Sequence, residues 1–350
     1  MKKTLILFCL SLLLVSCNQN DKVIHVERAF YCWKNPDVSR ENMDLLQKNN
    51  ISKIYMKLFE IDYSETMGNY PFNKNQPWYY RDFLKDSLEV IPTIFIKNEI
   101  FKYNDEKSLD KLADNIVYLI EKYSYYTDYY DNKKEKIFDY KEIQIDCDWT
   151  KSTKEQYFYL LKKIKQLSHK KISCTLRLYA YKYPKSMGVP PVDKAMLMCY
   201  NLIKPLSEHN KNSILDIPEL KKYLDKKRSY PLHLDIALPT FYWTQMYQNN
   251  RFVKLIKYSP KEIKTFTKQV KPFWYLVERD TVINYEYFKM GDQLKCEEVS
   301  AETINQAIDW IKKMVSLDKN TTISLFDLDD NTFKQYSHEE ISGFYNRFTE

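Results

Sequence analysis

Residues 142–150 read EIQIDCDWT, and this stretch decides the fold. Polar and apolar side chains alternate along it with the period of two that is typical of a β-strand. The alternation places Gln144, Asp146 and Asp148 on one face and the apolar residues between them on the other. A helical pattern follows at once, with apolar residues three and four positions apart between Tyr157 and Leu167. A strand that runs directly into a helix indicates one unit of an α/β fold.

The same strand-to-helix pattern recurs along the chain. Repeated units of this kind predict a parallel sheet, and eight of them predict closure into a (β/α)8 barrel of the TIM type. An open, doubly wound sheet is the alternative, but its usual glycine-rich first turn is missing. Residues 240–300 are long for one loop and helix, so we expect an insertion after the seventh strand. The eight strand-like runs are Ala29–Trp33, Ile54–Phe59, Val90–Ile96, Ile143–Trp149, Ile172–Tyr181, Ala195–Tyr200, Leu232–Leu238 and Thr322–Phe326.

The first residues have the pattern of an export signal. Lys2 and Lys3 precede an apolar run that continues to Val15, which is too short to span a bilayer as a helix. The following Leu14-Val15-Ser16-Cys17 resembles the bacterial lipobox, whose cysteine thiol receives diacylglycerol; an ordinary secretory signal is the alternative. We therefore expect a signal peptide over 1–16, lipidated Cys17 with a short tether over 17–25, and a single barrel domain over 26–350. The expected location is the cell envelope, anchored to the outer membrane if the cell has one.

Composition excludes several classes of function. The 350 residues include only four glycines, too few for the usual phosphate-binding loops, and five histidines in no zinc-binding pattern. The net charge of +7 is spread along the chain without a block of like charges, which argues against nucleic acid as a partner. We expect a monomer that needs no cofactor and no metal. Free, buried thiols are expected at Cys32, Cys147, Cys174 and Cys199.

Asp146 and Asp148 are the candidate catalytic residues. In a (β/α)8 barrel the chemistry lies at the carboxyl ends of the strands. Two carboxylates at the end of one strand repel each other and raise the pKa of one of them, as a general acid needs. The alternative is that both acids only pair with cations in the barrel, for which Lys57 and Arg177 are the candidates.

Strand phase also gives candidate ligand-binding residues on neighbouring strands. Side chains that point inward at the ends of several strands should meet at one barrel mouth. An aromatic segment, residues 241–243, follows the seventh strand. The candidate substrate-binding residues are Gln144, Arg177, Tyr179, Tyr200, Asn201, Asp235 and Trp243.

Two of these motifs resemble known barrel proteins. The Gln144-x-Asp146-x-Asp148 strand with its Ser152-Thr153 helix start, together with Met198-Cys199-Tyr200-Asn201, resembles an uncharacterised bacterial barrel family in the glycoside-hydrolase-like superfamily. More distantly, the motifs are similar to the family 18 chitinases, which have D-x-D-x-E on the fourth strand and M-x-Y-D on the sixth. Aligned on Trp149, the chain has Thr150 at the position of the chitinase acid; in the alternate register, Asp148 keeps a carboxylate at that position, but a shorter one. On the sixth strand Asn201 replaces the aspartate.

The resemblance implies a barrel that binds a glycan and can hydrolyse it, with Asp148 as the general acid and Asp146 tuning it. The alternative is a noncatalytic glycan-binding or envelope-scaffold lipoprotein whose active site has decayed.

Overall fold

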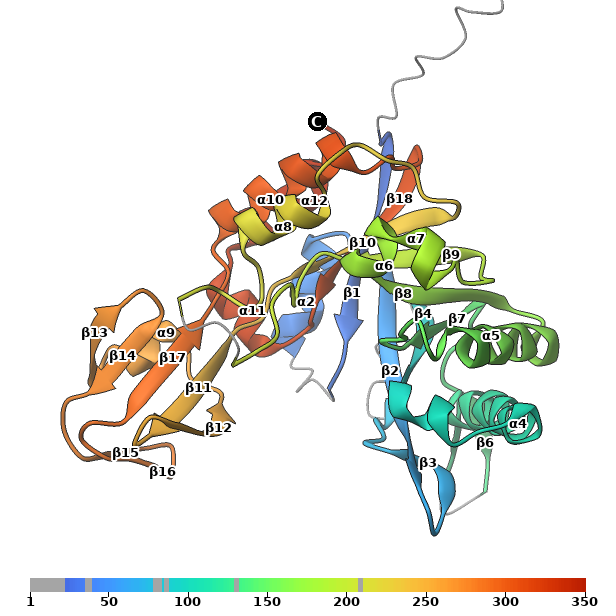
Figure 1. The fold of residues 1–350 in the computed structure, drawn as a ribbon, viewed down its shortest axis with the longest axis horizontal. Coiled ribbons are helices and arrows are strands. Elements are labelled where there is room, and N and C mark those ends of the chain that lie inside the picture. Colours follow the sequence, from blue (N-terminus) through green and yellow to red (C-terminus); the bar gives the residue numbers. More distant parts are fainter. Residues whose placement is uncertain (1–22, 35–39, 78–83, 85–87, 129–131, 207–209) are drawn as a thin grey trace, which may run out of the picture.

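The structure is a computed structural model that describes residues 23–34, 40–77, 84, 88–128, 132–206 and 210–350. Eight parallel strands pair in sequence, and the first of them pairs with both the second and the last, which closes the barrel. The predicted (β/α)8 barrel is therefore confirmed (Figure 1). The proposed signal peptide and Cys17 lie outside the described residues. The barrel strands are β1 (His25–Cys32), β2 (Lys53–Ser64), β4 (Glu89–Ile96), β7 (Glu142–Asp146), β8 (Lys171–Arg177), β9 (Lys194–Met198), β10 (His233–Pro239) and β18 (Asn320–Phe326).

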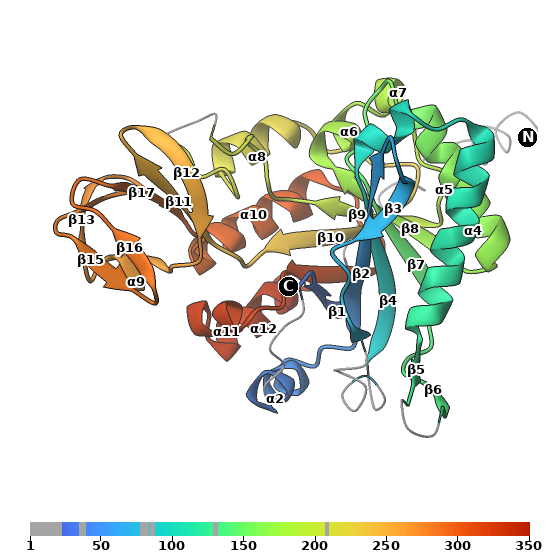
Figure 2. The same cartoon turned by 90° about the horizontal axis from the view of Figure 1, so that it is seen from below.

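Helices cover the outside of the barrel (Figure 2). α4 (Glu106–Tyr123) buries an apolar stripe that includes Leu109, Leu112 and Ile116, and the side chain of Asp105 caps its first turn by accepting from the Ser108 backbone N–H. The other helices are α2 (Arg40–Lys48), η2 (Asn98–Lys102), α5 (Lys154–Ser168), α6 (Leu178–Lys182), α7 (Pro184–Met187), α8 (Ile217–Tyr223), α10 (Ala301–Met314), α11 (Asp330–Gln335) and α12 (His338–Asn346). None of the helices in the described part is long and apolar enough to cross a membrane.

The side chains of β7 follow the predicted phase. Gln144 and Asp146 are buried inside the barrel, while Ile145 and Cys147 belong to the apolar layer under α5. The hydroxyl of Tyr157 in α5 donates to the Ile145 carbonyl at 3.3 Å, which fixes the helix against this strand. Buried free thiols are confirmed at Cys32, Cys147, Cys174 and Cys199.

The fifth strand is shorter than its sequence pattern predicts. β8 ends at Arg177, and the chain turns directly into α6, so the predicted strand up to Tyr181 is wrong in its last four residues. The helix buries Tyr181, whose hydroxyl donates to the Arg228 carbonyl at 3.0 Å, and leaves Tyr179 exposed. Residues 178–181 alternate too briefly for periodicity to separate one helical turn from a strand.

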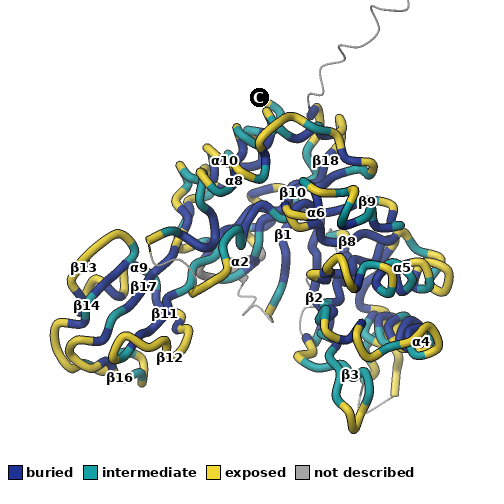
Figure 3. Tube along the Cα trace, in the orientation of Figure 1, coloured by how far each residue is buried: buried dark blue, intermediate teal, exposed yellow. Residues whose placement is uncertain are grey.

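The predicted insertion after the seventh strand forms a sheet of its own. Its five antiparallel strands run in the order β12-β11-β17-β14-β13 and bury a separate apolar cluster around Leu294, Tyr275 and Phe288. Figure 3 shows buried barrel strands and a largely exposed rim on the insertion. The strands outside the barrel are β3 (Gly68–Phe72), β5 (Tyr125–Thr127), β6 (Lys134–Lys136), β11 (Trp243–Gln248), β12 (Arg251–Ile256), β13 (Thr267–Lys271), β14 (Trp274–Val277), β15 (Thr281–Ile283), β16 (Glu286–Phe288) and β17 (Gln293–Glu297), with the short helix α9 (Pro260–Ile263).

The two ends of the barrel have different surroundings. The insertion and the β2–β3 hairpin extend beyond the carboxyl ends of the barrel strands, on opposite sides of the mouth (Figure 1). The first residues of β1 and the carboxyl terminus of the chain lie at the other end of the barrel. Among the described residues, the insertion and the β2–β3 hairpin thus stand at the mouth, whereas the two-stranded β5–β6 sheet precedes the start of β7.

Candidate functional site

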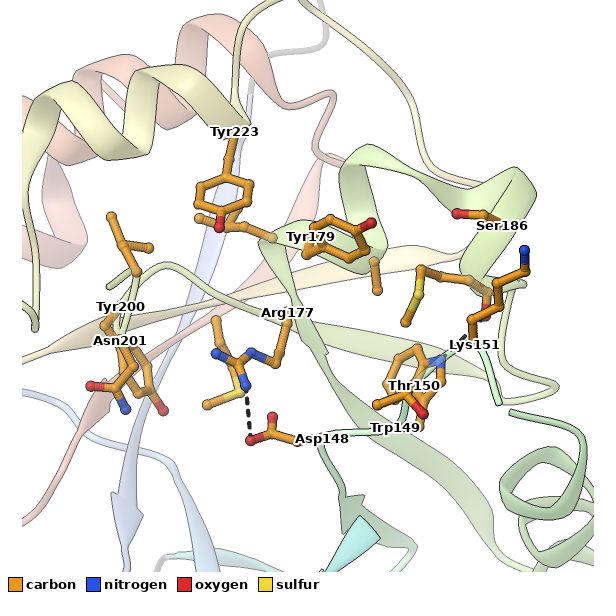
Figure 4. Close-up of a pocket in the computed structure, with 15 residues that line it drawn as sticks. Asp148, Trp149, Thr150, Lys151, Arg177, Tyr179, Ser186, Tyr200, Asn201 and Tyr223 are labelled. Carbon is orange, nitrogen blue, oxygen red and sulfur yellow. Dashed lines mark hydrogen bonds and ion pairs between the residues drawn. The ribbon is translucent and has the colours of Figure 1, made fainter. Parts of the chain in front are cut away.

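A cavity of about 620 Å³ opens at the carboxyl ends of β7, β8 and β9 (Figure 4). This volume is within the range of small-molecule sites. Five segments form its wall: the loop after β7, the β8–α6 junction, α7, the exit of β9 and the end of α8. Its lining residues are Asp148, Trp149, Thr150, Lys151, Arg177, Leu178, Tyr179, Ala180, Ser186, Met187, Met198, Tyr200, Asn201, Leu202 and Tyr223.

The two candidate acids have different environments. Asp146 is buried and accepts a 2.5 Å hydrogen bond from the Thr175 hydroxyl, whereas Asp148 is exposed and lines the cavity. Burial, and then the charge of Asp148, raise the pKa of Asp146 to about 7, although the Thr175 hydrogen bond and Arg177 act in the opposite direction. Asp146, which the sequence predicts to tune the general acid, is thus itself the carboxyl group that holds a proton over part of the neutral pH range.

Arg177 and Asp148 form an ion pair at the cavity wall. The guanidinium Nη1 lies 3.0 Å from the carboxylate Oδ2, and each side chain is about half exposed. Lys57, the other cation considered as a partner for the acids, instead lies 2.5 Å from Glu60. The alternative prediction was that both acids pair with Lys57 and Arg177. Of those predicted ion pairs, the described residues contain the one between Asp148 and Arg177.

The end of β9 contributes an aromatic wall and an amide. Tyr200 is buried, with its ring 5.2 Å from that of Phe326 and 6.1 Å from that of Phe241. Asn201 adopts a left-handed backbone with φ of 52°, and its side-chain Oδ1 is buried without a hydrogen-bond partner. Tyr179, 51% exposed, offers a ring face at the opening.

Gln144 and Asp235 do not line this cavity. Gln144 lies deeper in the barrel, where its Oε1 accepts from the Tyr31 hydroxyl at 2.6 Å. Asp235 lies near the amino-terminal end of β10, where it is 2.9 Å from Lys194 and 3.2 Å from His233. Although burial opposes the shift, His233 and Lys194 lower the pKa of Asp235 to about 2. The structure thus places Asp235 in a buried ionic network away from the mouth.

Trp243 borders a second cavity of about 440 Å³, between the mouth and the insertion. Its indole Nε1 donates to Glu297 Oε2 at 2.5 Å, which orients the ring. Asn201 lines both cavities, so it marks their junction. Within the described residues no cluster of three or more histidine, cysteine, aspartate or glutamate side chains has the geometry of a metal site.

Sequence reasoning missed several lining residues. Trp33 and Asp327 directly follow the first and last barrel strands, and both line the second cavity. The rule that loops after barrel strands form the mouth could have identified them. Tyr223 and Lys257 come from segments distant in the sequence, so no local pattern indicates their position.

No protein-family model matches this chain, and no curated protein matches its sequence. Solved structures do match its fold. The spore cortex-lytic enzyme SleL of Bacillus cereus is 12% identical, with a TM-score of 0.53 over 94% of this chain and 75% of that one. SleL of Bacillus megaterium QM B1551 is also 12% identical, with a TM-score of 0.52 over 95% of this chain and 76% of that one. A chitinase from Bacteroides thetaiotaomicron is 11% identical, with a TM-score of 0.54 over 92% of this chain and 97% of that one.

The chain has a chitinase-like barrel fold. The distant resemblance inferred from the fourth and sixth strands is confirmed at this level. At 11–12% identity the likeness concerns the fold, and the chemistry depends on the residues of the cavity.

Proposed function

We propose that this chain binds a glycan in the 620 Å³ cavity without hydrolysing it. One observation carries the proposal: among the described residues that line the cavity, Asp148 is the sole carboxylate, and Arg177 is paired with it. Most glycosidases use two carboxyl groups that flank the bond; in family 18 the substrate's own N-acetyl group takes the place of the nucleophile, but a carboxylic acid must still protonate the leaving oxygen. The carboxylate at this cavity is instead paired with a guanidinium. In the register aligned on Trp149, Thr150 stands at the position of the chitinase acid, and its hydroxyl interacts with Ser152 and Thr153.

The rest of the lining suits sugar binding. Tyr179 and Tyr223 provide ring faces for the apolar face of a sugar, and Arg177, Ser186 and Asn201 provide polar atoms for its hydroxyl groups. The fold shared with a chitinase and with spore cortex-lytic enzymes gives the proposal a precedent among proteins that act on polymers.

Hydrolysis is the second candidate, and the environment of Asp146 favours it. The raised pKa of about 7 keeps a proton on this carboxyl within hydrogen-bonding distance of Thr175 and next to Asp148. In this alternative Asp146 tunes Asp148, which protonates the leaving oxygen. Burial of Asp146 favours the binding function, because its proton is not at the cavity surface.

The test combines binding and turnover on the full chain in detergent. A glycan array identifies a ligand, and calorimetry compares wild type with Tyr179→Ala, for which we expect about 2- to 10-fold weaker binding from the lost ring face. Tyr118→Ala is the control, because Tyr118 is an exposed tyrosine on α4 outside the cavity lining. Equal affinity in the two variants, or no ligand on the array, would contradict the proposal.

The hydrolysis assay uses the ligand found on the array. If the wild type turns it over and Asp148→Asn lowers the rate by roughly 2 to 4 powers of ten, the second candidate replaces the first. We expect no turnover by either protein and retained binding.

We also propose that the protein is an envelope lipoprotein. The lipobox-like Leu14-Val15-Ser16-Cys17 supports this, with residues 1–16 as the export signal and Cys17 as the acylated residue that carries diacylglycerol and palmitate. Its location would then be the membrane surface, on the outer membrane if the cell has one.

A further inference from the structure

A third cavity, of about 480 Å³, lies where the insertion faces the first turns of α8 and α10. The β13–β14 hairpin and the end of β17 line it from the insertion, and the loop before α8 lines it from the barrel. Its described lining has no residue in common with the two cavities at the mouth. A ligand of the third cavity is therefore bound apart from the occupant of the barrel mouth.

The ionisable side chains of opposite sign are unevenly represented in this lining. It contains the carboxylates of Glu298 and Asp216, and among its described residues no lysine, arginine or histidine. Asp216 caps α8 by accepting from the Glu219 backbone N–H at 2.9 Å, which leaves its other oxygen without a donor in the described part of the chain. The starts of α8 and α10 contribute at most about half a positive elementary charge each. Two carboxylates exceed that charge, so the cavity favours a cation.

Glu298 has no partner for its carboxylate. Among the described residues no group forms a hydrogen bond or an ion pair with it, whereas its backbone carbonyl accepts from the Asn212 side chain at 2.6 Å. Partial desolvation by the cavity wall raises the pKa of this carboxyl group, and the charge of Lys264, which forms no ion pair with it, opposes the shift. The Glu298 carboxylate is therefore available to a ligand.

Tyr275 adds a buried hydroxyl that the protein leaves unpaired. The residue lines the cavity from β14 and is 6% exposed, and its hydroxyl forms no hydrogen bond within the described part of the chain. Burial, followed by Cys296 and Glu298, raises the pKa of Tyr275, as expected when its hydroxyl and the Glu298 carboxylate face one cavity. Buried polar groups are nearly always paired in native proteins, so this hydroxyl indicates a polar ligand.

An unusual turn places an aromatic ring in the same wall. Pro272 and Phe273 form the two-residue turn between β13 and β14, and Phe273 has a left-handed backbone with φ of 68°. Glycine or asparagine is the usual residue for that conformation in a tight turn, so phenylalanine is unfavourable for the turn itself. The ring lies beside two carboxylates and a tyrosine, and aromatic faces attract ammonium groups.

We propose that the third cavity binds an ammonium group on an aliphatic stem, from a small free amine or from a lysine side chain of a partner polypeptide. Glu298 is its ion-pair partner, the Tyr275 hydroxyl accepts one of its three N–H donors, and Asp216 adds a second negative charge. The stem packs on Phe273.

The experiment compares probes of similar length and different charge. The full chain in detergent is titrated calorimetrically with 1,5-diaminopentane as the free amine and with acetyl-Ala-Lys-Ala-amide as the peptide. The neutral probe is 1,5-pentanediol, and the anionic probe is glutarate. We expect both amines to bind more tightly than these two probes, and the tighter of the two amines identifies the source of the ammonium group.

Two variants test the residues that carry the proposal. Glu298→Gln keeps the size of the side chain and removes its charge, so we expect about 10- to 100-fold weaker amine binding. Tyr275→Phe removes one acceptor and should weaken binding by about 2- to 10-fold. Glu106→Gln is the matched control, because Glu106 is exposed on α4 outside the cavity lining, and it should bind as the wild type does. Thermal melts establish that each variant is folded.

Three results would overturn the proposal. One is equal amine affinity of the wild type and Glu298→Gln, and another is binding of glutarate or 1,5-pentanediol as tight as that of the amines. The third is the absence of amine binding at millimolar concentration. The proposed glycan site is tested with other residues and other ligands, so it stands or fails independently of these results.

Discussion

Asp146 is a carboxyl group whose surroundings oppose its charge. It is buried between β7 and β8, its one hydrogen-bond donor from a side chain is Thr175 among the described residues, and Asp148 adds a like charge nearby. Its pKa of about 7 in the folded protein exceeds the ordinary value of about 3.9 in an unfolded chain. Between these two values the native state holds a proton that the unfolded state has released.

This difference predicts a pH dependence of stability. The contribution of protonated Asp146 to the free energy of unfolding is fully present below pH 4. It falls as the pH rises from about 4 to 7 and is absent above that range. Asp146→Asn cannot ionise and can still accept from Thr175, so we expect it to be more stable than the wild type at pH 8, by up to roughly 4 kcal/mol. Urea unfolding from pH 4 to pH 8 measures the difference. A gap between the two proteins that does not change with pH would contradict the prediction, and Asp309→Asn serves as an exposed control.

At the scale of elements, one glutamate joins the insertion to the barrel. Glu297, the last residue of β17, is fully buried and 2.8 Å from Lys295. It also accepts from the backbone and the side chain of Ser213, from Trp243 and from Gln245. The insertion, the loop after β9 and the wall of the second cavity are therefore fixed through one carboxylate.

Removing this carboxylate should destabilise the protein strongly. Glu297→Ala removes the carboxylate that pairs with the buried Lys295 ammonium and accepts four further hydrogen bonds, and we expect a loss of about 3–5 kcal/mol in the free energy of unfolding. Glu286→Ala breaks the partly exposed pair with Lys254 and should cost less than about 1 kcal/mol. Denaturant unfolding compares the two. Similar small losses would show that the junction does not depend on Glu297.

Strand alternation predicted the barrel because its strands are buried and apolar on their outer side. The insertion was predicted from its length, but its five-stranded sheet was not. β12 and β13 are short and mostly exposed, and so lack the contrast between two faces. A local signal was present in Asn249-Asn250, whose φ values of 49° and 60° form the turn between β11 and β12. Consecutive asparagines at that position favour a hairpin.

At the scale of the whole molecule, alternation along a strand predicts whether a side chain points into or out of the barrel. It does not predict how far along the barrel axis the side chain lies. Asp148, Arg177, Tyr200 and Asn201 meet at one cavity because each lies at or just after the carboxyl end of its strand. Asp235 shares the inward face, but it is the third residue of β10 and so contacts the starts of neighbouring strands. The position of a residue such as Tyr223, which comes from a distant segment, cannot be predicted from strand alternation. It follows only from the three-dimensional arrangement of the closed barrel.

The proposed anchor makes a prediction for the whole protein. Cys17→Ser removes the thiol that would be acylated, so we expect the protein to move from the membrane fraction to the soluble fraction of the envelope. Metabolic labelling with a radioactive fatty acid measures the modification directly, and Cys296→Ser, which alters a buried thiol of the insertion, is the matched control. Label retained in Cys17→Ser would refute the lipoprotein proposal.

The position of β1 sets the orientation of such an anchored protein. Because β1 begins at the end of the barrel opposite the cavities, eight residues after Cys17, a tether of at most about 30 Å would connect the lipid to that end. The cavities would then open away from the bilayer, with the insertion and the β2–β3 hairpin farthest from it. A protein held in this way meets polymers that arrive from the surrounding medium, whereas lipid headgroups of its own membrane remain out of reach.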